Sequence, residues 1–312
     1  MVNIRQFLAQ LKHVLWSRLS SAFEQKLPKL PYVVVLPALN RSWQEHDARV
    51  KAFMVERLLD QPVLFTDRFN VQYLLYPSDN LYDRYYNHGY SEVAEQDFCA
   101  SYIKPGMTAF DVGANYGMYT MLLSKLVGLG QVHAFEPEQW NFYRLQCNLV
   151  INRCKNVKAH PCAVFSSTGE VTLNVFQKEQ FGWHTLGTPN MVVGGQRVLP
   201  STKCRVRSVS LDEYCDQNRI ARIDFLKVDV EGAELDVFQG ARRLLRHGRI
   251  ECVLFEISKP MIEGMGHEPV EIFDFLRGFG MSLHAIAAGG TLSPAPVEPG
   301  ASYQNFVALR TK

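Results

Sequence analysis

"TAFDVGANYGMYTMLLSKLV", residues 108–127, contains the turn on which the fold depends. Its first five residues form an apolar run that predicts a strand, and the apolar spacing after Gly117 predicts a helix that ends at Gly128. Asp111, Gly113 and Gly117 lie where the strand becomes the helix. Glycines at such a turn serve the chain reversal, and they also let a ligand approach the backbone closely. The motif alone favours neither explanation.

Strands and helices alternate from Met107 to the end of the chain. The predicted strands cover residues 108–112, 131–136, 157–164, 223–230, 250–257, 282–287 and 305–310. The predicted helices cover residues 117–127, 138–151, 233–246 and 270–279. Apolar strands separated by amphipathic helices indicate an α/β fold, with helices on both faces of a mostly parallel sheet. Ligands of such sheets bind beyond the carboxyl ends of the strands, which is where the glycine motif lies on the first strand.

Residues 165–211 interrupt this alternation. Segments 169–176 and 205–211 alternate apolar and polar residues and predict a hairpin. The glycine-rich stretch 177–196 between them is expected to be either a functional loop or a disordered one.

Two further elements are predicted ahead of the alternating region. Residues 63–76 read as two short strands around a turn at residues 67–70. Ser91 is expected to cap a helix that runs to about Lys104, with Glu92 favourably placed in its first turn.

Composition indicates a globular protein, and it also bears on where the protein is located and which partners it binds. The 312 residues are 47% apolar and 21% charged, which is enough to bury a substantial core. The net charge of +2 gives no case for a nucleic-acid partner. Seven cysteines without a C-x-x-C pair favour reduced thiols over disulfides or zinc. No apolar run approaches the ~20 residues that span a bilayer, so a cytoplasmic location is expected.

The N-terminal segment differs in charge from the rest of the chain. Residues 1–30 carry five basic side chains against one acidic side chain, and their apolar residues are spaced as one helical stripe. This segment is interpreted either as a helix docked on the body or on a second subunit, or as a basic amphipathic helix on an anionic membrane surface. Residues 26–40 contain three prolines and predict a linker. We therefore expect an extension over residues 1–60 and a main domain over residues 61–312.

The glycine spacing bears on the ligand. A pyrophosphate site prefers G-x-G-x-x-G, whereas this turn has G-x-x-x-G with Asp111 in the first position, which favours a smaller nucleoside ligand. Glu136 ends the second strand, where an acid is well placed to accept both hydroxyls of a ribose. Asp229 ends a buried strand and should point into the crevice beside the first one. Glu234, in contrast, is expected to cap the helix that follows.

Several longer motifs agree in order and spacing with a known family. They are "DVGANYGMYT", "HAFEP", "NLVINRCKNV", "AVFSSTGEVTL", "VSLDEY", "IDFLKVDVEGAELDVFQGARRLL" and "VLFEIS". Over roughly residues 75–310 the chain resembles the FkbM-type methyltransferases. This resemblance implies a Rossmann-like sheet of seven strands that binds S-adenosylmethionine. It also implies methyl transfer to an oxygen of a sugar, glycolipid or polyketide-like acceptor.

The resemblance also implies which residues hold the cofactor. They are Asp111, Gly113, Ala114, Asn115, Gly117, Tyr119, Thr120, Glu136, Pro137, Ala163, Val164 and Asp229. Within this set, Glu136 would bind the ribose hydroxyls, and Ala163 and Val164 would flank the adenine. Asp229 would lie nearest the transferable methyl group.

The reaction needs a group that removes the proton of the acceptor hydroxyl, because an alcohol is a weak acid. The candidate bases are Asp229, Glu231, Glu256 and His184. Histidine has the most suitable intrinsic pKa, although a loop histidine is more often simply exposed. Trp183 either stacks on a sugar ring or fixes the loop as a hydrophobic plug. Asp229 and Glu231 would suit magnesium, but nothing in the sequence demands a metal, and none is predicted.

Two alternatives belong to other functional classes. A nicotinamide-dependent oxidoreductase is disfavoured by the glycine spacing. A non-catalytic adaptor with a methyltransferase fold would bind a membrane surface through residues 1–30, but the intact cofactor loop argues against it.

Overall fold

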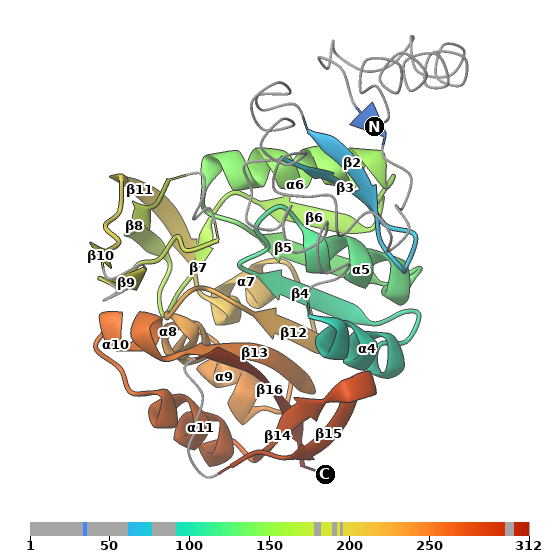
Figure 1. The fold of residues 1–312 in the computed structure, drawn as a ribbon. Helices are drawn as coiled ribbons and strands as arrows, with labels where there is room; N and C mark the ends of the chain where they lie inside the picture. Colours follow the sequence, from blue (N-terminus) through green and yellow to red (C-terminus); the bar gives the residue numbers. More distant parts are fainter. Residues whose placement is uncertain are drawn as a thin grey trace.

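The main sheet of the protein has eight strands. The computed structural model describes residues 34–35, 62–76, 92–177, 182–188, 192–193, 196–296 and 303–311. The strand order is β15-β14-β16-β13-β12-β4-β5-β6 (Figure 1). Their bounds are β4 (Thr108–Val112), β5 (Gln131–Phe135), β6 (Val157–His160), β12 (Phe225–Val228), β13 (Cys252–Ser258), β14 (Met281–Ala287), β15 (Thr291–Pro294) and β16 (Tyr303–Arg310). Seven of these match the predicted strands, and β15 adds an edge strand antiparallel to β14. The predicted α/β fold is confirmed.

The strand order reverses between β4 and β12. From β4 the chain adds β5 and then β6 on one side, and it later returns to β12 on the other side of β4, all in parallel. β13 extends the parallel part, and β16 pairs antiparallel with β13. The carboxyl ends of β4 and β12 therefore lie side by side at the reversal, which is the position expected for a ligand site.

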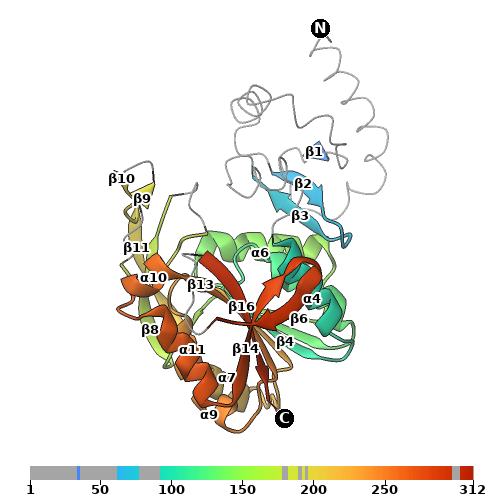
Figure 2. The same ribbon diagram turned by 60° about the horizontal axis from the view of Figure 1, so that its bottom comes forward.

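Helices cover both faces of this sheet, as predicted. They are α4 (Val93–Tyr102), α5 (Met118–Val127), α6 (Gln139–Ile151), α7 (Leu211–Gln217), α8 (Glu234–Gln239), α9 (Arg242–Arg246), α10 (Lys259–Gly264), α11 (Pro269–Gly278) and the 3-10 turn η3 (Ala288–Gly290). Neighbouring strand residues point to opposite faces. Ala109 packs in the hydrophobic cluster beneath α4 and α5, whereas Phe110 packs with α7, α8, α9 and α11. Figure 2 shows α4 on one side of the sheet and α9 and α11 on the other.

One predicted strand is divided in two. The sequence pattern indicates a single strand over residues 157–164, but β6 ends at His160 and is followed by Pro161. β6 is the edge strand and pairs only with β5; this pairing ends at His160, and Pro161 has no N–H to donate to a further ladder hydrogen bond. Ala163 and Val164 form β7 (Ala163–Val164), which pairs in parallel with β11 (Thr202–Val209) in a separate sheet.

The predicted helix over residues 233–246 is also divided, into α8 and α9. Gly240 ends α8, and a Cβ atom at this position would lie 2.2 Å from the carbonyl oxygen of Phe165. The close approach of these two backbone segments requires glycine, which also lowers helix propensity.

The remaining predicted strands of the described region are confirmed. β8 (Gly169–Val175) pairs antiparallel with β11 as the predicted hairpin, and β2 (Val63–Thr66) pairs with β3 (Gln72–Leu75) around a turn. At that turn, the Asp67 carboxylate accepts hydrogen bonds from the backbone N–H groups of Phe69 and Val71. The short strands not predicted from the sequence are β1 (Val34–Val35), β9 (Val192–Val193) and β10 (Gln196–Arg197).

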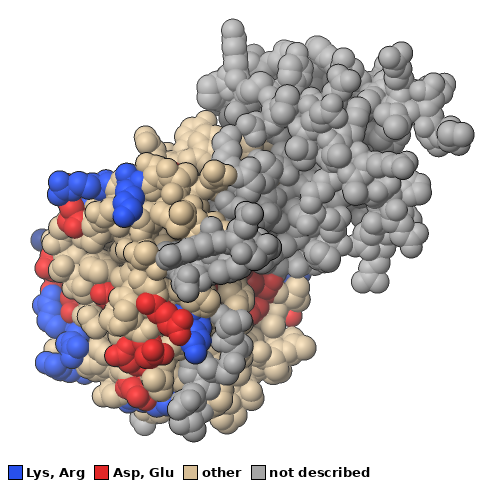
Figure 3. Space-filling view, turned by 60° about the vertical axis from the view of Figure 1, so that its left-hand side comes forward, with Lys and Arg blue, Asp and Glu red and all other residues tan. Residues whose placement is uncertain are grey.

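The structure also bears on the expectations for the cysteines, membrane-spanning helices and the N-terminal extension. All seven cysteines are unpaired, as predicted. None of the helices within the described residues has the length and apolar character needed to cross a membrane. The N-terminal extension lies outside the described residues except for β1, as does most of the loop over residues 177–196. On the face drawn in Figure 3, acidic and basic side chains are interspersed among uncharged ones.

Candidate active site

A cavity of about 230 Å³ opens at the carboxyl ends of β4, β5, β12 and β13. It brings together most of the residues that the sequence predicts for the site. These are Gly113, Ala114, Asn115, Tyr119, Glu136, Pro137, Ala163, Val164, His184, Asp229, Glu231 and Glu256, with Trp183 beside them. Three predicted cofactor residues, Asp111, Gly117 and Thr120, do not line it. Two of them connect to the lining indirectly, because Thr120 donates to Asp111 and Asp111 lies close to Lys227, which lines the cavity.

The two glycines of the opening motif serve different purposes. Gly113 has φ 79°, and a Cβ atom there would lie 1.7 Å from the carbonyl oxygen of Asp229, so only glycine lets β4 turn past the end of β12. Gly113 also lines the cavity. Gly117 has φ 96°, and a Cβ atom there would collide with Leu145 and Met121. Gly113 therefore serves both packing and the cavity, whereas Gly117 serves packing.

Glu136 is buried at the end of β5 and held by the backbone. Its Oε2 accepts a hydrogen bond from the Asn115 N–H at 2.8 Å, and its Oε1 accepts one from the Glu138 N–H at 2.8 Å. Burial raises the pKa of Glu136 to about 8. Each carboxylate oxygen has a second lone pair, so Glu136 retains capacity to accept ligand hydroxyls.

A buried lysine that the sequence analysis did not single out joins two of the predicted acids. Lys227, in β12, donates to Asp229 Oδ2 at 2.9 Å and lies 3.8 Å from Asp111 Oδ1. Thr120 donates to Asp111 Oδ2 at 2.5 Å. Burial alone would lower the pKa of Lys227, but the Asp229 and Asp111 carboxylates raise it on balance. A lysine inside the apolar run "DFLKVDV" is the signal that could have identified it, since buried charges need partners.

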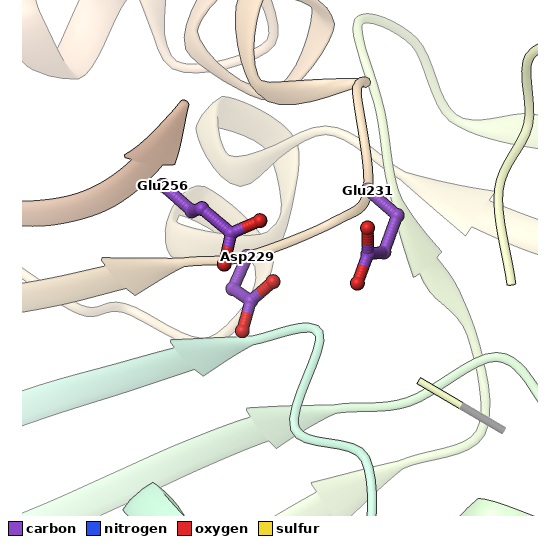
Figure 4. A group of neighbouring side chains, drawn as sticks. All are labelled: Asp229, Glu231 and Glu256. Carbon is purple, nitrogen blue, oxygen red and sulfur yellow. The ribbon is translucent and has the colours of Figure 1, made fainter. Parts of the chain in front are cut away.

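Three carboxylates gather beside this lysine. Asp229 follows β12, Glu231 lies on the next turn and Glu256 lies on β13, with oxygen atoms within 4.8 Å of one another (Figure 4). Burial and repulsion from Asp229 raise the pKa values of Glu231 and Glu256 well above the usual range. Carboxylates suit a hard divalent cation, but acidic groups of this kind are common without one. The absence of a metal stays a prediction.

Glu234 has a structural role, but it is not the helix cap that the sequence predicts, because it is the first residue of α8 and the N-cap is Ala233, with no side-chain cap. Its Oε1 accepts hydrogen bonds from the N–H groups of Val230 and Gly232, on the turn that leads into α8. Its side chain therefore fixes the turn that carries Glu231, and it does not line the cavity.

The start of α4 differs from the prediction. The helix begins at Val93, and Glu92 precedes it with φ 52° and ψ 48° and makes no side-chain cap. Glu92 is thus not in the first turn, and its Oε2 accepts a hydrogen bond from the Tyr119 hydroxyl at 2.5 Å. Glu92 lines the cavity, and burial raises its pKa to about 7. Sequence reasoning missed this residue because its helix-start pattern is equally typical of a surface cap.

Three of the six described non-glycine residues with positive φ line the cavity. Glu92, Asn115 and Glu231 line it, and all three have φ between 51° and 52°. Non-glycine residues adopt this left-handed conformation at a cost, and such residues tend to cluster at functional sites.

The segment over residues 182–188 forms part of the cavity wall. The Thr185 hydroxyl donates to the Glu231 carbonyl oxygen at 2.6 Å, and Thr185 also pairs with Asn174 of β8. His184 Nδ1 accepts a hydrogen bond from the Phe176 N–H at 3.1 Å. Burial lowers the pKa of His184, so the ring is neutral and its proton lies on Nε2. This tautomer presents a donor, not a base, at the free nitrogen.

These features fit S-adenosylmethionine, the predicted cofactor. Ala163 and Val164 supply an apolar wall for a nucleobase, although they reach it from β7 and not from the main sheet. Glu136 has the acceptors that a ribose needs. The carboxylates beyond it suit a cationic group, because buried positive charge requires compensation.

Comparison with known proteins agrees with this assignment. The model of the FkbM methyltransferase domain matches residues 111–283. The chain is 31% identical over 204 residues to 31-O-demethyl-FK506 methyltransferase FkbM of Streptomyces tacrolimicus, covering 59% of this chain and 75% of that one. It is 30% identical over 180 residues to methyltransferase sdnD of Sordaria araneosa, covering 50% of this chain and 70% of that one.

Other similarities are more distant. Methyltransferase 1 of Beauveria bassiana (strain ARSEF 2860) is 28% identical over 141 residues, which are 42% of this chain and 56% of that relative. The crystal structure of methyltransferase FkbM from Methylobacillus flagellatus KT matches with 15% identity and a TM-score of 0.42, covering 66% of this chain and 43% of that one. The family model matches more than half of the length of this chain. The chain therefore belongs to the FkbM methyltransferase family and is an S-adenosylmethionine-dependent methyltransferase.

Proposed function

We propose that this protein is an O-methyltransferase that methylates a hydroxyl of a small sugar, glycolipid or polyketide-like acceptor. The observation that carries the proposal is the group of Asp229, Glu231 and Glu256 at the end of the cavity. Three carboxylates offer several acceptors for hydroxyl protons, and a hydroxyl-rich ligand can satisfy them. The name of the Streptomyces tacrolimicus relative also denotes methylation at an oxygen, and that relative supports the same type of reaction here.

S-adenosylmethionine, when bound, supplies an electrophilic methyl group on a sulfonium. The residues of this chain would have two tasks, to orient the acceptor hydroxyl and to accept its proton. Lys227 donates to Asp229 Oδ2 and so orients this carboxylate at the end of β12. Close carboxylates titrate as a group, so we assign the proton to Asp229, Glu231 and Glu256 together.

His184 has a different role in this proposal. Its Nδ1 is occupied by the Phe176 N–H, so its Nε2–H would be the group that donates a hydrogen bond to a ligand. It would therefore position a ligand oxygen and would not remove a proton. Trp183 lines the same wall and would contact the acceptor or hold the loop in place.

The test is a mass-spectrometric screen with methyl-labelled S-adenosylmethionine. Sugars, glycolipids and polyketides with free hydroxyls are offered, and the methylated position is assigned by NMR. We expect a gain of one methyl group on oxygen, with kcat lowered about 10²–10⁴-fold in Asp229→Asn. Methylation of a nitrogen, or full activity of Asp229→Asn, would overturn the proposal.

The two alternative functions, an oxidoreductase and a non-catalytic adaptor, predict different binding and activity from a methyltransferase. An oxidoreductase would bind NADH and not S-adenosylhomocysteine. An adaptor would bind anionic vesicles and would not turn over any acceptor. Family membership supports the methyltransferase over both.

A further inference from the structure

Glu92 adopts a costly conformation that its own helix does not need. Its φ of 52° and ψ of 48° are in the left-handed region, which side-chain-bearing residues seldom adopt. An N-cap residue normally gains a hydrogen bond from its side chain to the helix backbone, and Glu92 makes none. The conformation instead directs the carboxylate to the Tyr119 hydroxyl and into the cavity. This arrangement points to a ligand as the reason for the strain.

The position of Glu92 follows from its neighbours. Tyr119 is the second residue of α5, and the Nζ atom of Lys227 lies 4.8 Å from the centre of its ring. Lys227 belongs to β12, on the far side of β4 from β5 and Glu136. Glu92 therefore lies toward the β12 end of the cavity. Ala163 and Val164, which form the apolar wall, follow shortly after β6, and β6 is the strand beyond β5 in the main sheet.

A nucleoside bound at Glu136 with its base against that apolar wall would direct its 5′ substituent toward β12. In S-adenosylmethionine this substituent carries the sulfonium and the amino-acid part, which ends in an α-ammonium and an α-carboxylate. A buried ammonium needs a charged acceptor. Glu92 provides one, and the Tyr119 hydroxyl orients it by donating to Oε2.

We propose that Glu92 binds the α-ammonium group of the methionine part of the cofactor, an inference that rests on the cofactor site described above. Asp229, whose Oδ2 accepts a hydrogen bond from Lys227, then remains available to the acceptor. The proposal thus divides the acids of the cavity into one that recognises the cofactor's amino acid and a group that serves the acceptor.

Comparing the affinities of two ligands tests whether Glu92 binds the α-ammonium group. S-adenosylhomocysteine carries the α-ammonium, whereas 5′-methylthioadenosine has the same nucleoside and lacks the amino acid. Calorimetric titration of the full chain measures Kd for both. We expect Glu92→Gln to weaken S-adenosylhomocysteine by about 30-fold or more, since it removes one partner of a buried charge pair. The Kd for 5′-methylthioadenosine should stay within about twofold of wild type, because a ligand without an ammonium makes no ion pair with Glu92.

Glu95→Gln is the matched control. Glu95 lies on α4 near Glu92, but its carboxylate accepts from the Asn305 side chain and does not line the cavity. Both ligands should bind this variant like wild type. Tyr119→Phe is a second variant, in case Glu92→Gln does not fold. It should weaken S-adenosylhomocysteine selectively, because the hydroxyl that orients Glu92 is lost.

The other outcomes each overturn the proposal. Unchanged S-adenosylhomocysteine affinity in Glu92→Gln, with a raised KM for the acceptor, would assign Glu92 to the acceptor. An equal loss for both ligands would show that the variant disturbs the nucleoside site. Failure of the wild-type chain to bind either ligand would instead refute the cofactor assignment itself, which keeps the two failures distinguishable.

Discussion

Lys227 donates a hydrogen bond to Asp229 at 2.9 Å, and both residues lie at the carboxyl end of β12. The same ammonium lies 3.8 Å from Asp111, whose side chain is fully buried at the end of β4. One lysine therefore interacts with carboxylates on both of the strands between which the strand order reverses. This arrangement allows several acids to surround one cavity.

Removing that ammonium should destabilise the protein. Lys227→Met leaves Asp111 and Asp229 without their partner, and breaking a buried pair from one side costs about 3–5 kcal/mol. Urea unfolding of wild type and variant measures the difference. Lys203→Met, on an exposed part of β11, is the control and should change the unfolding free energy by less than about 0.5 kcal/mol. A loss as small as the control's would contradict the role given to Lys227.

Two glycine substitutions should differ although both positions have positive φ. Gly106→Ala, with φ 91° and no atom within 4 Å of the added Cβ, should cost about 1–2 kcal/mol for the left-handed conformation alone. Gly113→Ala places its Cβ 1.7 Å from the Asp229 carbonyl oxygen, so it should prevent folding or separate β4 from β12. Thermal unfolding and S-adenosylhomocysteine binding check this. Equal stability of the two variants would refute the packing explanation for Gly113.

The stability of the ligand-free protein should fall as pH rises. The pKa of Glu136 is about 8 in the folded protein against an ordinary value of 4.5, because burial disfavours its charged form. The folded state thus binds the proton more tightly, so its contribution to stability is complete below pH 4.5 and is lost as pH rises toward 8. Each pKa unit corresponds to about 1.4 kcal/mol.

Glu136→Gln should reduce this pH dependence, measured as the unfolding free energy between pH 5 and 9. Part of the slope will remain, because burial also raises the pKa values of Glu92 and Glu234 to about 7. Glu170→Gln, on the exposed part of β8, should leave the slope unchanged. If Glu136→Gln behaves like Glu170→Gln, the pKa of Glu136 is not raised in solution.

Substitution of His184 tests whether this residue acts as a hydrogen-bond donor or as the general base. Glutamine can place an N–H near the position of Nε2, so His184→Gln should keep most of the activity, while His184→Ala should lose about tenfold from the missing hydrogen bond. The pH profile of kcat/KM should keep its shape in both. If His184 is the base, both variants should lose about 10²–10⁴-fold.

The N-terminal segment can be tested without a structure of it. Residues 1–30 carry five basic side chains against one acidic side chain, and deletion of residues 1–28 should lower sedimentation with anionic vesicles. S-adenosylhomocysteine should bind as before, because the described residues that line the cavity all lie at position 92 or later. Unchanged sedimentation would favour docking on the body or on a second subunit.

Local sequence patterns were sufficient for most elements and for the positions of several acids, but they missed α7, α10 and β15. Apolar runs and helical spacing predicted the seven strands because periodicity and turn residues act within a few positions of one another. Glu136 and Asp229 could be placed at strand ends for the same reason. The pattern could not exclude one strand over residues 157–164, since two short strands and one longer strand share the same local preferences.

Tertiary structure decided the contacts between distant segments. It brought the Asp229 carbonyl against Gly113, and it brought the ammonium of Lys227, in β12, close to Asp111 in β4. It also placed Glu92 against Tyr119, which is 27 positions away in the chain. Such contacts depend on how helices and strands pack in space, and no short-range pattern encodes this. The sequence by itself therefore determined the family, the order of the elements and the location of the site. Packing determined which charges in that site are neutralised and which remain available to a ligand.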